Sequence, residues 1–309
     1  MQKRYYSLKQ FLTEKFGEKV YKISIDAGFS CPNRNSSSGN TGCIFCSPRG
    51  SGDFAENPSL SISEQLYDSQ KGIRKLAAEY GINKYIAYFQ AYTNTFASVQ
   101  ELRKKYLEAI SVPGVIGIAI ATRPDCLGPE VLELLSELSR QTYIWVELGL
   151  QTIHEKTAVL INRGYSLSCF EEAVSNLNTI GIDVVCHLIF GLPGENKEDM
   201  QKSVEFISHK KLQGVKLHLL HVLEGTVLAQ MYKAGEFNTL SIDEYVELVV
   251  RSLELLPPDF VIHRLTGDGP KNSLIAPEWS KNKREVLNRI EKELNFRNIY
   301  QGSLWNQYI

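Results

Sequence analysis

The stretch YKISIDAGFSCPNRNSSSGNTGCIFC, residues 21–46, places a short β-rich run directly before a loop that holds three cysteines. Eleven residues separate Cys31 from Cys43, and two separate Cys43 from Cys46. Similar apolar, β-branched runs recur along the chain, and each is short enough to be a single strand. We therefore expect seven strands, at residues 21–26, 84–90, 115–122, 143–151, 183–191, 214–223 and 260–265.

Amphipathic segments alternate with these runs, at residues 61–81, 128–140, 167–181 and 196–210. The first opens with Ser61 and Glu64, which is a capping-box pattern, and closes at Gly81. Strand–helix alternation with near-continuously apolar strands predicts a parallel α/β sheet. The pattern leaves a partial (β/α) barrel, a complete barrel and a doubly wound sheet open. In all three, chemistry collects beyond the carboxyl ends of the strands.

The composition favours a cytoplasmic protein. A net charge of −1 over 309 residues provides no overall attraction to nucleic acid or membrane. The first residues lack the apolar segment of a signal peptide, and no apolar run is long enough to span a membrane. In the cytoplasm, six cysteines are expected to be ligands, catalysts or buried thiols rather than disulfides.

Three cysteines in one loop allow three interpretations. Thiolates hold iron–sulfur clusters, and three ligands leave one iron of a [4Fe–4S] cube open for chemistry. A structural zinc ion instead needs a fourth ligand, which a distant histidine can supply. The thiols could also be unrelated. The other cysteines, Cys126, Cys169 and Cys186, are expected to be structural thiols.

A resemblance favours the cluster. The cysteine pattern, together with ELGLQT (147–152), INRGYS (161–166) and HLIFGLPGE (187–195), resembles the radical S-adenosylmethionine (SAM) superfamily. The usual spacing there is three residues and then two. The longer loop is similar to the subgroup that contains the radical SAM domain of the Elongator catalytic subunit. The resemblance covers about residues 20–270. It implies a partial or complete TIM-type barrel, a single domain over 1–309, and a C-terminal helical extension at 271–309.

The resemblance also implies cofactors and the residues that hold them. Cys31, Cys43 and Cys46 would bind a [4Fe–4S] cluster whose open iron chelates SAM, and one electron would then release a 5′-deoxyadenosyl radical. Phe45 would lie beside the adenine. QAYTNT (90–95) replaces the family's glycine-rich motif, so the methionine end of SAM would meet polar side chains from this segment, namely Gln90, Asn94 and Thr95.

Two later strands complete the implied SAM site. Gln151 would bond the ribose hydroxyls, with Glu147 on the same strand, and Arg163 would pair with the SAM carboxylate. The fifth strand would run along the adenosine through His187, Ile189 and Gly191. The role of His187 is open, because the relatives carry an acidic residue at this position. Asn94 and Thr95 could instead cap the helix near Ser98.

Residues after the last strands are candidates for substrate contact or proton transfer. His218 and His221 can face the same side only if their strand ends or bulges between them, and each could equally be structural. Arg264, with Asp268 and Lys271, suits a phosphate or carboxylate, although an ion-paired loop is equally compatible.

By the resemblance, the expected reaction is remodelling of the 5-substituent of tRNA wobble uridine, from carboxymethylaminomethyl to aminomethyl. Flavodoxin or ferredoxin would donate the electron. Two alternatives remain: radical chemistry on a small metabolite or tetrapyrrole-like carboxylate, and a non-catalytic zinc- or cluster-containing RNA-binding protein. Residues 271–309 carry seven Lys/Arg against four Glu, with interleaved aromatics that suit RNA. The apolar stripe there instead predicts helix packing, through Val286, Ile290 and Leu294.

Overall fold

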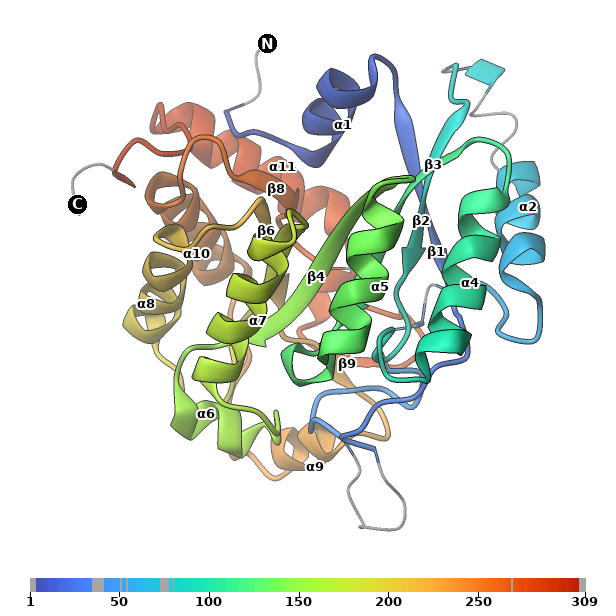
Figure 1. Ribbon diagram of the computed structural model, residues 1–309. Coiled ribbons are helices and arrows are strands. Elements are labelled where there is room, and N and C mark those ends of the chain that lie inside the picture. The colour runs from blue at the N-terminus through green and yellow to red at the C-terminus, as the bar shows by residue number, and fades with distance from the viewer. Residues whose placement is uncertain are drawn as a thin grey trace.

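The computed structural model describes residues 4–34, 42–50, 52–53, 55–72, 78–79, 81–267 and 269–305. Its centre is a sheet of seven parallel strands in the order β1-β2-β3-β4-β5-β6-β8. Within the described residues the edge strands β1 and β8 do not pair, so the sheet curls into an open half-barrel (Figure 1). This confirms the partial-barrel alternative. The strands are β1 (Val20–Ile25), β2 (Lys84–Phe89), β3 (Val115–Thr122), β4 (Tyr143–Gln151), β5 (Asp183–Phe190), β6 (Gly214–Leu219) and β8 (Val261–Arg264).

One predicted strand is two in the structure. The run 214–223 breaks after Leu219, opposite the point where its neighbour β5 also ends at Phe190. Leu220 still donates its N–H to Phe190 O, and the chain then turns away. It re-enters as β7 (Val222–Leu223), which pairs antiparallel with β9 (Leu274–Ala276). A strand of three residues in a Pro-rich segment gives too weak a pattern to be found from sequence.

Helices cover the convex face of the sheet, and α4, α5 and α7 lie side by side over it in Figure 1. The four predicted helical segments are present, although residues 73–77 and 80 of the first lie outside the described part of the chain. The helices are α1 (Leu8–Phe16), α2 (Ile62–Gly72), α4 (Val99–Ser111), α5 (Pro129–Ser139), α6 (Glu155–Leu160), α7 (Leu167–Thr179), α8 (Lys197–Ser208), α9 (Val227–Lys233), α10 (Ile242–Leu255) and α11 (Lys283–Phe296), with short 3-10 helices at Pro124–Cys126 and Glu278–Lys281.

Strand alternation separates two environments. Outward side chains such as Ile120, Val146 and Leu217 are fully buried beneath the helices. The helices present matching stripes: α8 starts with a capping box of Asn196 and Asp199 and buries Met200 and other apolar residues on one side. The capping box predicted at Ser61 and Glu64 is also formed. The convex face of the sheet is therefore a dry core, which leaves the concave face for polar chemistry.

Helix α1 closes the amino-terminal end of the half-barrel. Leu12 is buried against the inward side chains of the sheet, and the Phe11 and Phe16 rings pack on Tyr143 at the start of β4, at centroid distances of 6.3 and 5.8 Å. The helix contacts both edge strands, β1 and β8. The interior is consequently sealed at this end, and ligands enter from the carboxyl ends of the strands.

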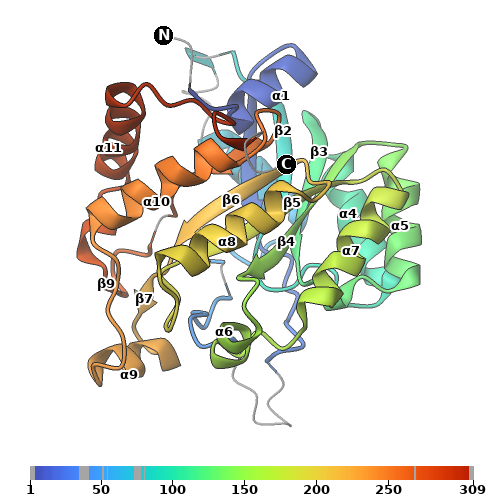
Figure 2. The same ribbon diagram turned by 90° about the vertical axis from the view of Figure 1, so that its left-hand side faces the viewer.

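The first described residues are joined to the last. Gln301 accepts a hydrogen bond from Tyr6 N at 2.9 Å and donates its own N–H to Arg4 O at 2.9 Å. The Gln301 side-chain amide also donates to Pro257 O and Phe260 O, just before β8. Figure 2 shows α1 and α11 at the same end of the molecule.

The predicted stripe on the last helix packs as expected. Val286, Ile290 and Leu294 are at most 1% exposed and belong to the main core. Phe296, on the same helix, is 84% exposed. The organisation of residues 1–309 as a single domain stays a prediction. Among the described residues, no helix is both long and apolar enough to cross a membrane.

Candidate active site

A cavity opens at the carboxyl ends of the strands, inside the half-barrel, with about 920 Å³ of empty volume up to its mouth. Its described lining comes from the cysteine loop and from six strand ends. We call one part of its wall the rim: residues 31–34 and 42–50 with Tyr92, Arg123 and Gln151. We call the inner part and its support the floor: Lys22, Tyr88, Glu147, His187, Lys216, His218 and Arg264.

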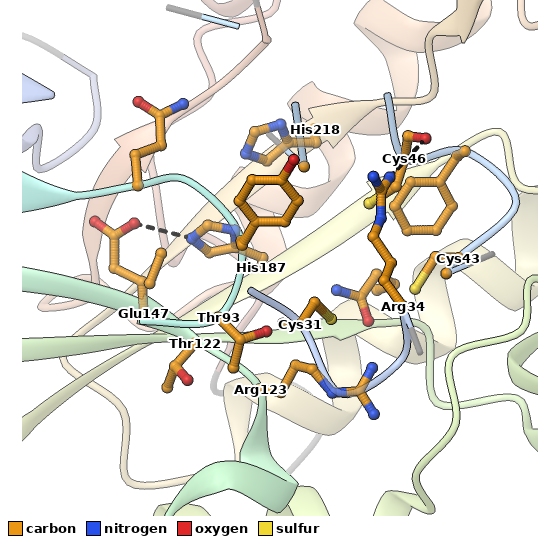
Figure 3. Close-up of a pocket in the computed structure, with 18 of the residues that line it drawn as sticks. Cys31, Arg34, Cys43, Cys46, Thr93, Thr122, Arg123, Glu147, His187 and His218 are labelled. Carbon is orange, nitrogen blue, oxygen red and sulfur yellow. Dashed lines mark hydrogen bonds and ion pairs between the residues drawn. The ribbon is translucent and has the colours of Figure 1, made fainter. Parts of the chain in front are cut away.

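The rim brings the three predicted cluster ligands together. Cys31, Cys43 and Cys46 all line the cavity, and Figure 3 shows them on one side of it, with Glu147 on the opposite side. Residues 35–41, between the first two cysteines, lie outside the described part. The described portion is anchored through Ile44, whose N–H donates to Ile161 O and whose carbonyl accepts from Leu228 N.

Basic and amide groups surround the thiols. The Arg34 guanidinium donates to the carbonyls of Cys46, Ser47 and Pro48, and so ties the loop to itself. Asn33 Nδ2 lies 3.5 Å from Cys43 Sγ. The Cys46 thiol donates to Cys43 and, with Arg123 nearby, lowers the pKa of Cys43 to about 7. A thiolate is the form that binds a metal, so this environment favours ligation.

The donor set fits an iron–sulfur cluster better than a structural zinc ion. Among the described residues, no group of three or more His, Cys, Asp or Glu side chains already stands in metal-binding geometry. Of the histidines that could complete a zinc site, His154 bonds Asp199 O, and His187 bonds Glu147. Three thiols beside Arg34 and Arg123 instead suit an anionic, thiolate-bound group with one position left for a ligand.

Two lining residues adopt backbone conformations that side chains rarely take. Tyr92 has φ 60° and Gln151 has φ 63°, both in the left-handed region. Gln151 ends β4, and its Oε1 accepts from Tyr165 Oη at 2.9 Å, while the same hydroxyl also bonds Gly149 O. Such strain is retained at functional sites when it aims a side chain. Gln90 and Phe45, also predicted for SAM, line the same cavity.

The floor is a buried charge cluster centred on Glu147. This carboxylate has no exposed surface and pairs with Lys216, with Lys22 at 3.5 Å and with His187 at 3.2 Å. It also accepts from Trp145 Nε1 at 3.0 Å. Lys216 itself is 1% exposed. Glu147 was predicted to bind cofactor; it does line the cavity, but its oxygens are occupied by these partners.

The electrostatics of the floor follow from burial and pairing. Burial alone would raise the pKa of Glu147, but Lys216 and then Lys22 hold it well below its usual range. Burial, followed by the charge of Lys216, lowers the pKa of His187 to about 4. Glu147 is therefore ionised and His187 neutral near pH 7.

The predicted substrate residues separate. His218 and Arg264 line the cavity, and the His218 ring stacks on His187 with centroids 5.3 Å apart. His221 lies beyond the end of β6, outside the described lining, close to His218 across Gly267. Asp268 lies outside the described residues. The strand therefore ends between the two histidines, the condition required for both to approach the same space.

Asn94 and Thr95, both predicted to contact SAM, bond the ends of strands and do not belong to the described cavity lining. Asn94 Nδ2 donates to Phe89 O and Ala121 O, and its side chain is fully buried. The Thr95 hydroxyl bonds Thr122 Oγ1 and Cys126 O. Neither caps α4, because Ser98 accepts the N–H of Glu101 there. The two side chains thus join β2 to β3 beneath the rim.

Arg163 is buried away from the described lining. Its side chain is 1% exposed, and its guanidinium donates to the carbonyls of Leu150, Thr152 and Tyr165. Pairing with the SAM carboxylate stays a prediction, and it would require an exchange of these bonds. In the structure, Arg163 fixes the strained end of β4 that carries Gln151.

Two further predicted contacts lie behind the lining. Gly191 has φ 89° and donates its N–H to Met200 Sδ, so it forms the turn after β5. Ile189 packs against the same small apolar cluster as Phe45. Cys186 is in the core, whereas Cys126 and Cys169 are partly exposed, and all three are free thiols.

Several residues of the rim and the floor were not predicted from the sequence. Arg34 and Tyr92 stand in loops with no periodic pattern. Lys216 and Lys22 lie in strands, where a lysine normally signals a solvent-facing position. The available signal was alternation, since Lys216 and His218 share one face of β6, and the fold makes this face the interior.

Comparison with known proteins identifies the family. The model described as Radical SAM superfamily matches residues 36–207, more than half of the chain, and the Radical_SAM C-terminal domain model matches residues 212–295. The chain belongs to the radical SAM superfamily. It is therefore an enzyme whose cofactors are SAM and a [4Fe–4S] cluster, which decides against the non-catalytic alternative.

Three relatives illustrate the position of this radical SAM enzyme. It is 46% identical to YtqA of Bacillus subtilis over 306 residues, covering 99% of this chain and 94% of the relative. It is 30% identical to human Elongator complex protein 3 over 197 residues, covering 62% of this chain and 35% of that protein. The structure of the archaeal Methanocaldococcus infernus Elp3 covers 93% of this chain and 67% of its own, with TM-score 0.70 and 18% identity, so it supports the fold.

Proposed function

We propose that this radical SAM enzyme remodels the 5-substituent of wobble uridine in tRNA, converting a carboxymethylaminomethyl group to an aminomethyl group. The similarity to Elongator complex protein 3 carries the proposal, because the expanded cysteine loop and the ELGLQT and HLIFGLPGE segments resemble a subgroup tied to this uridine. The cavity supports it through the basic residues that line it.

The rim would hold the cofactors. Cys31, Cys43 and Cys46 are the proposed cluster ligands, with Arg34 and Arg123 offsetting the negative charge of the thiolates. When bound, the cluster and SAM supply one-electron chemistry able to remove a hydrogen atom from an unactivated carbon. Flavodoxin or ferredoxin is the proposed electron donor.

Protein side chains along the strand ends would orient SAM. Phe45 offers a ring to the adenine, and Gln151 offers an amide that Tyr165 already holds in position. Gln90 lines the same wall, where its amide can meet the methionine end. Burial and the charge of Lys216 keep His187 neutral, and its bond to Glu147 fixes the ring, so it can contact the adenosine without adding charge.

The wobble base would have to leave its stack to enter the cavity. Enzymes that act on a base take it from the nucleic-acid stack or bind a single strand. The anticodon loop presents such a base, and its 5-substituent would point toward His218 and Arg264. The two-carbon carboxymethyl part would leave as glyoxylate, with SAM as the two-electron oxidant and water as the co-reactant that supplies the new glyoxylate oxygen.

The test is mass spectrometry of tRNA nucleosides from cells with and without the gene. Loss of the gene should accumulate 5-carboxymethylaminomethyl nucleosides. Wild type and Cys169→Ala should restore the aminomethyl form, whereas Cys43→Ala should not. An unchanged nucleoside profile would remove tRNA as the substrate.

A second candidate is a small carboxylate-bearing metabolite, and the presence of Arg264 in the cavity favours it specifically. This candidate predicts an unchanged tRNA profile and an altered profile of small carboxylates in the same cells. The two measurements therefore separate the candidates.

A further inference from the structure

The described lining of the cavity contains more positive than negative groups. Three arginines face it, namely Arg34, Arg123 and Arg264, against the single carboxylate of Glu147. Arg123 has its own partner in Asp125, with bonds of 2.9 and 2.7 Å. Arg34 is occupied by backbone carbonyls of the cysteine loop. The balance at the floor therefore depends on Arg264.

Arg264 makes no hydrogen bond or ion pair with any residue that the structure describes. It ends β8, next to Lys216 on β6 in the strand register. Glu147 cannot serve it, because that carboxylate already receives Lys22, Lys216, His187 and the Trp145 indole. A guanidinium held partly buried without a counter-ion is costly, and an anion from a ligand removes that cost.

The charge of Arg264 acts on its neighbours. Burial first, and then repulsion that includes Arg264, lowers the pKa of Lys216 well below its usual range, and it lowers the pKa of Lys22 also. Both lysines are basic groups that lack enough negative charge around them. One bound carboxylate would interact favourably with all three basic side chains.

His218 supplies a second polar group at the same place. It lines the cavity, and its Nε2 is buried with no hydrogen-bond partner among the described residues. Burial, and next the charge of Arg264, lowers its pKa well below the ordinary value, so the ring is neutral. A neutral imidazole carries one N–H donor, which an anionic oxygen would satisfy.

We propose that Arg264, with His218 beside it, is the specificity site for a carboxylate on the substrate. The proposal rests on the proposed function only for the identity of that substrate, the carboxymethylaminomethyl uridine. Guanidinium and carboxylate match as a two-pronged pair, so the site would select the acid form over its aminomethyl product. Figure 3 shows His218 and His187 between the cysteines on one side of the cavity and Glu147 on the other.

The same anionic chemistry has a second source, the carboxylate of SAM itself. The experiment therefore measures how tightly both ligands bind to four cluster-loaded proteins: the wild type, Arg264→Gln, Arg264→Lys and the surface control Arg289→Gln. Circular dichroism and iron content verify that each variant is folded and loaded. The RNA probes are anticodon stem–loops that carry 5-carboxymethylaminomethyluridine or 5-aminomethyluridine, measured by fluorescence anisotropy with SAM present.

Wild type and Arg289→Gln should bind the acid form about tenfold more tightly than the amine form. Arg264→Gln should remove this preference, and Arg264→Lys should keep part of it. The SAM dissociation constant should stay within about twofold of wild type. The proposal is overturned if Arg264→Gln keeps the preference for the acid form. If that variant also weakens SAM binding about tenfold, Arg264 serves the SAM carboxylate instead.

A probe without RNA separates this proposal from the tRNA function. N-benzylglycine carries the carboxymethylaminomethyl group on a simple ring, and benzylamine is its counterpart without the carboxylate. If the stem–loops do not bind but N-benzylglycine binds in an Arg264-dependent manner by calorimetry, the tRNA function fails and the carboxylate site stands. If no probe depends on Arg264, the carboxylate site fails.

Discussion

The rim and the floor of the cavity are built in opposite ways. The centre of the floor is assembled from side chains that satisfy one another, with Glu147 paired to three basic groups and no surface exposed. The rim is held mainly through the backbone, and its three thiols have no metal-binding geometry among the described residues. The difference teaches that the Glu147 cluster is complete before any ligand arrives, whereas the rim needs its cofactor to be complete.

The largest effect is expected from removing a rim thiol. Cys43→Ala should reduce iron from about four atoms per chain to almost none, because two thiolates cannot hold the cluster. Iron analysis and the visible absorption of the anaerobically loaded protein measure this change. Cys169→Ala is the matched control, since Cys169 lies on α7 away from the cavity lining, and it should keep its iron. Equal iron in the two variants would contradict the assignment of the rim.

Removing a floor cation should reduce folding stability instead. Lys216→Met leaves the buried Glu147 carboxylate without its nearest partner, at an expected cost of about 3 kcal/mol in free energy of unfolding. Urea unfolding measures it. Lys210→Met breaks the partly exposed pair of Lys210 with Glu171 and should cost less than about 1 kcal/mol.

The double variant sharpens this comparison. Lys216→Met with Glu147→Gln removes both charges of the central pair and should be less destabilised than Lys216→Met alone. Strictly additive losses would mean that the floor is not a coupled ion cluster.

A smaller effect is expected at the strained end of β4. Gln151→Gly relieves a positive φ but loses the bond to Tyr165, so folding stability should change by less than about 1 kcal/mol. SAM binding should weaken about tenfold, because the amide proposed to contact the ribose is lost. Unchanged SAM affinity, measured by equilibrium dialysis, would assign the strain to folding alone.

A further effect, which depends on conditions, is a pH dependence of the floor. The pKa of His187 is lowered to about 4 in the fold, first by burial and then by Lys216. The unfolded chain binds a proton below about pH 6.5, whereas the folded chain does so only near 4. Stability present above pH 6.5 is therefore lost as the pH falls toward 4, by up to about 1.4 kcal/mol per pH unit.

His187→Gln should reduce this slope by one proton, as measured by urea unfolding between pH 7 and 4.5. The exposed His209→Gln should keep the parent slope. An identical slope for His187→Gln would show that His187 is not held neutral by the floor.

The sequence predicted most of the frame. Seven apolar runs gave the strands, because burial on both faces leaves a continuous pattern. The break after Leu219 was not predicted, since the run remains apolar through Leu223 while the geometry of the neighbouring strand decides where it ends. The capping box of Ser61 and Glu64 involves residues close together in the sequence, so it could be predicted from the sequence.

The site was only partly predictable. Cysteine spacing and strand-end position predicted that Cys31, Gln90 and Gln151 lie together, and all three line one cavity. Arg163 and Asn94 satisfy the backbone nearby, and a sequence motif does not separate such support from ligand contact. The pairing of Lys216 with Glu147 joins residues 69 positions apart, so no local pattern reveals it.

The contacts between Arg4, Tyr6 and Gln301 also set an order of events during synthesis. These partners are nearly 300 positions apart, so the amino-terminal segment emerges from the ribosome long before its anchor exists. Closing so long a loop is entropically slow, and the segment before helix α1 gains these bonds only when the region around Gln301 has been synthesised. Because α1 seals one end of the half-barrel, the interior of a nascent chain would be fully closed to water only after Gln301 has bonded the amino-terminal segment.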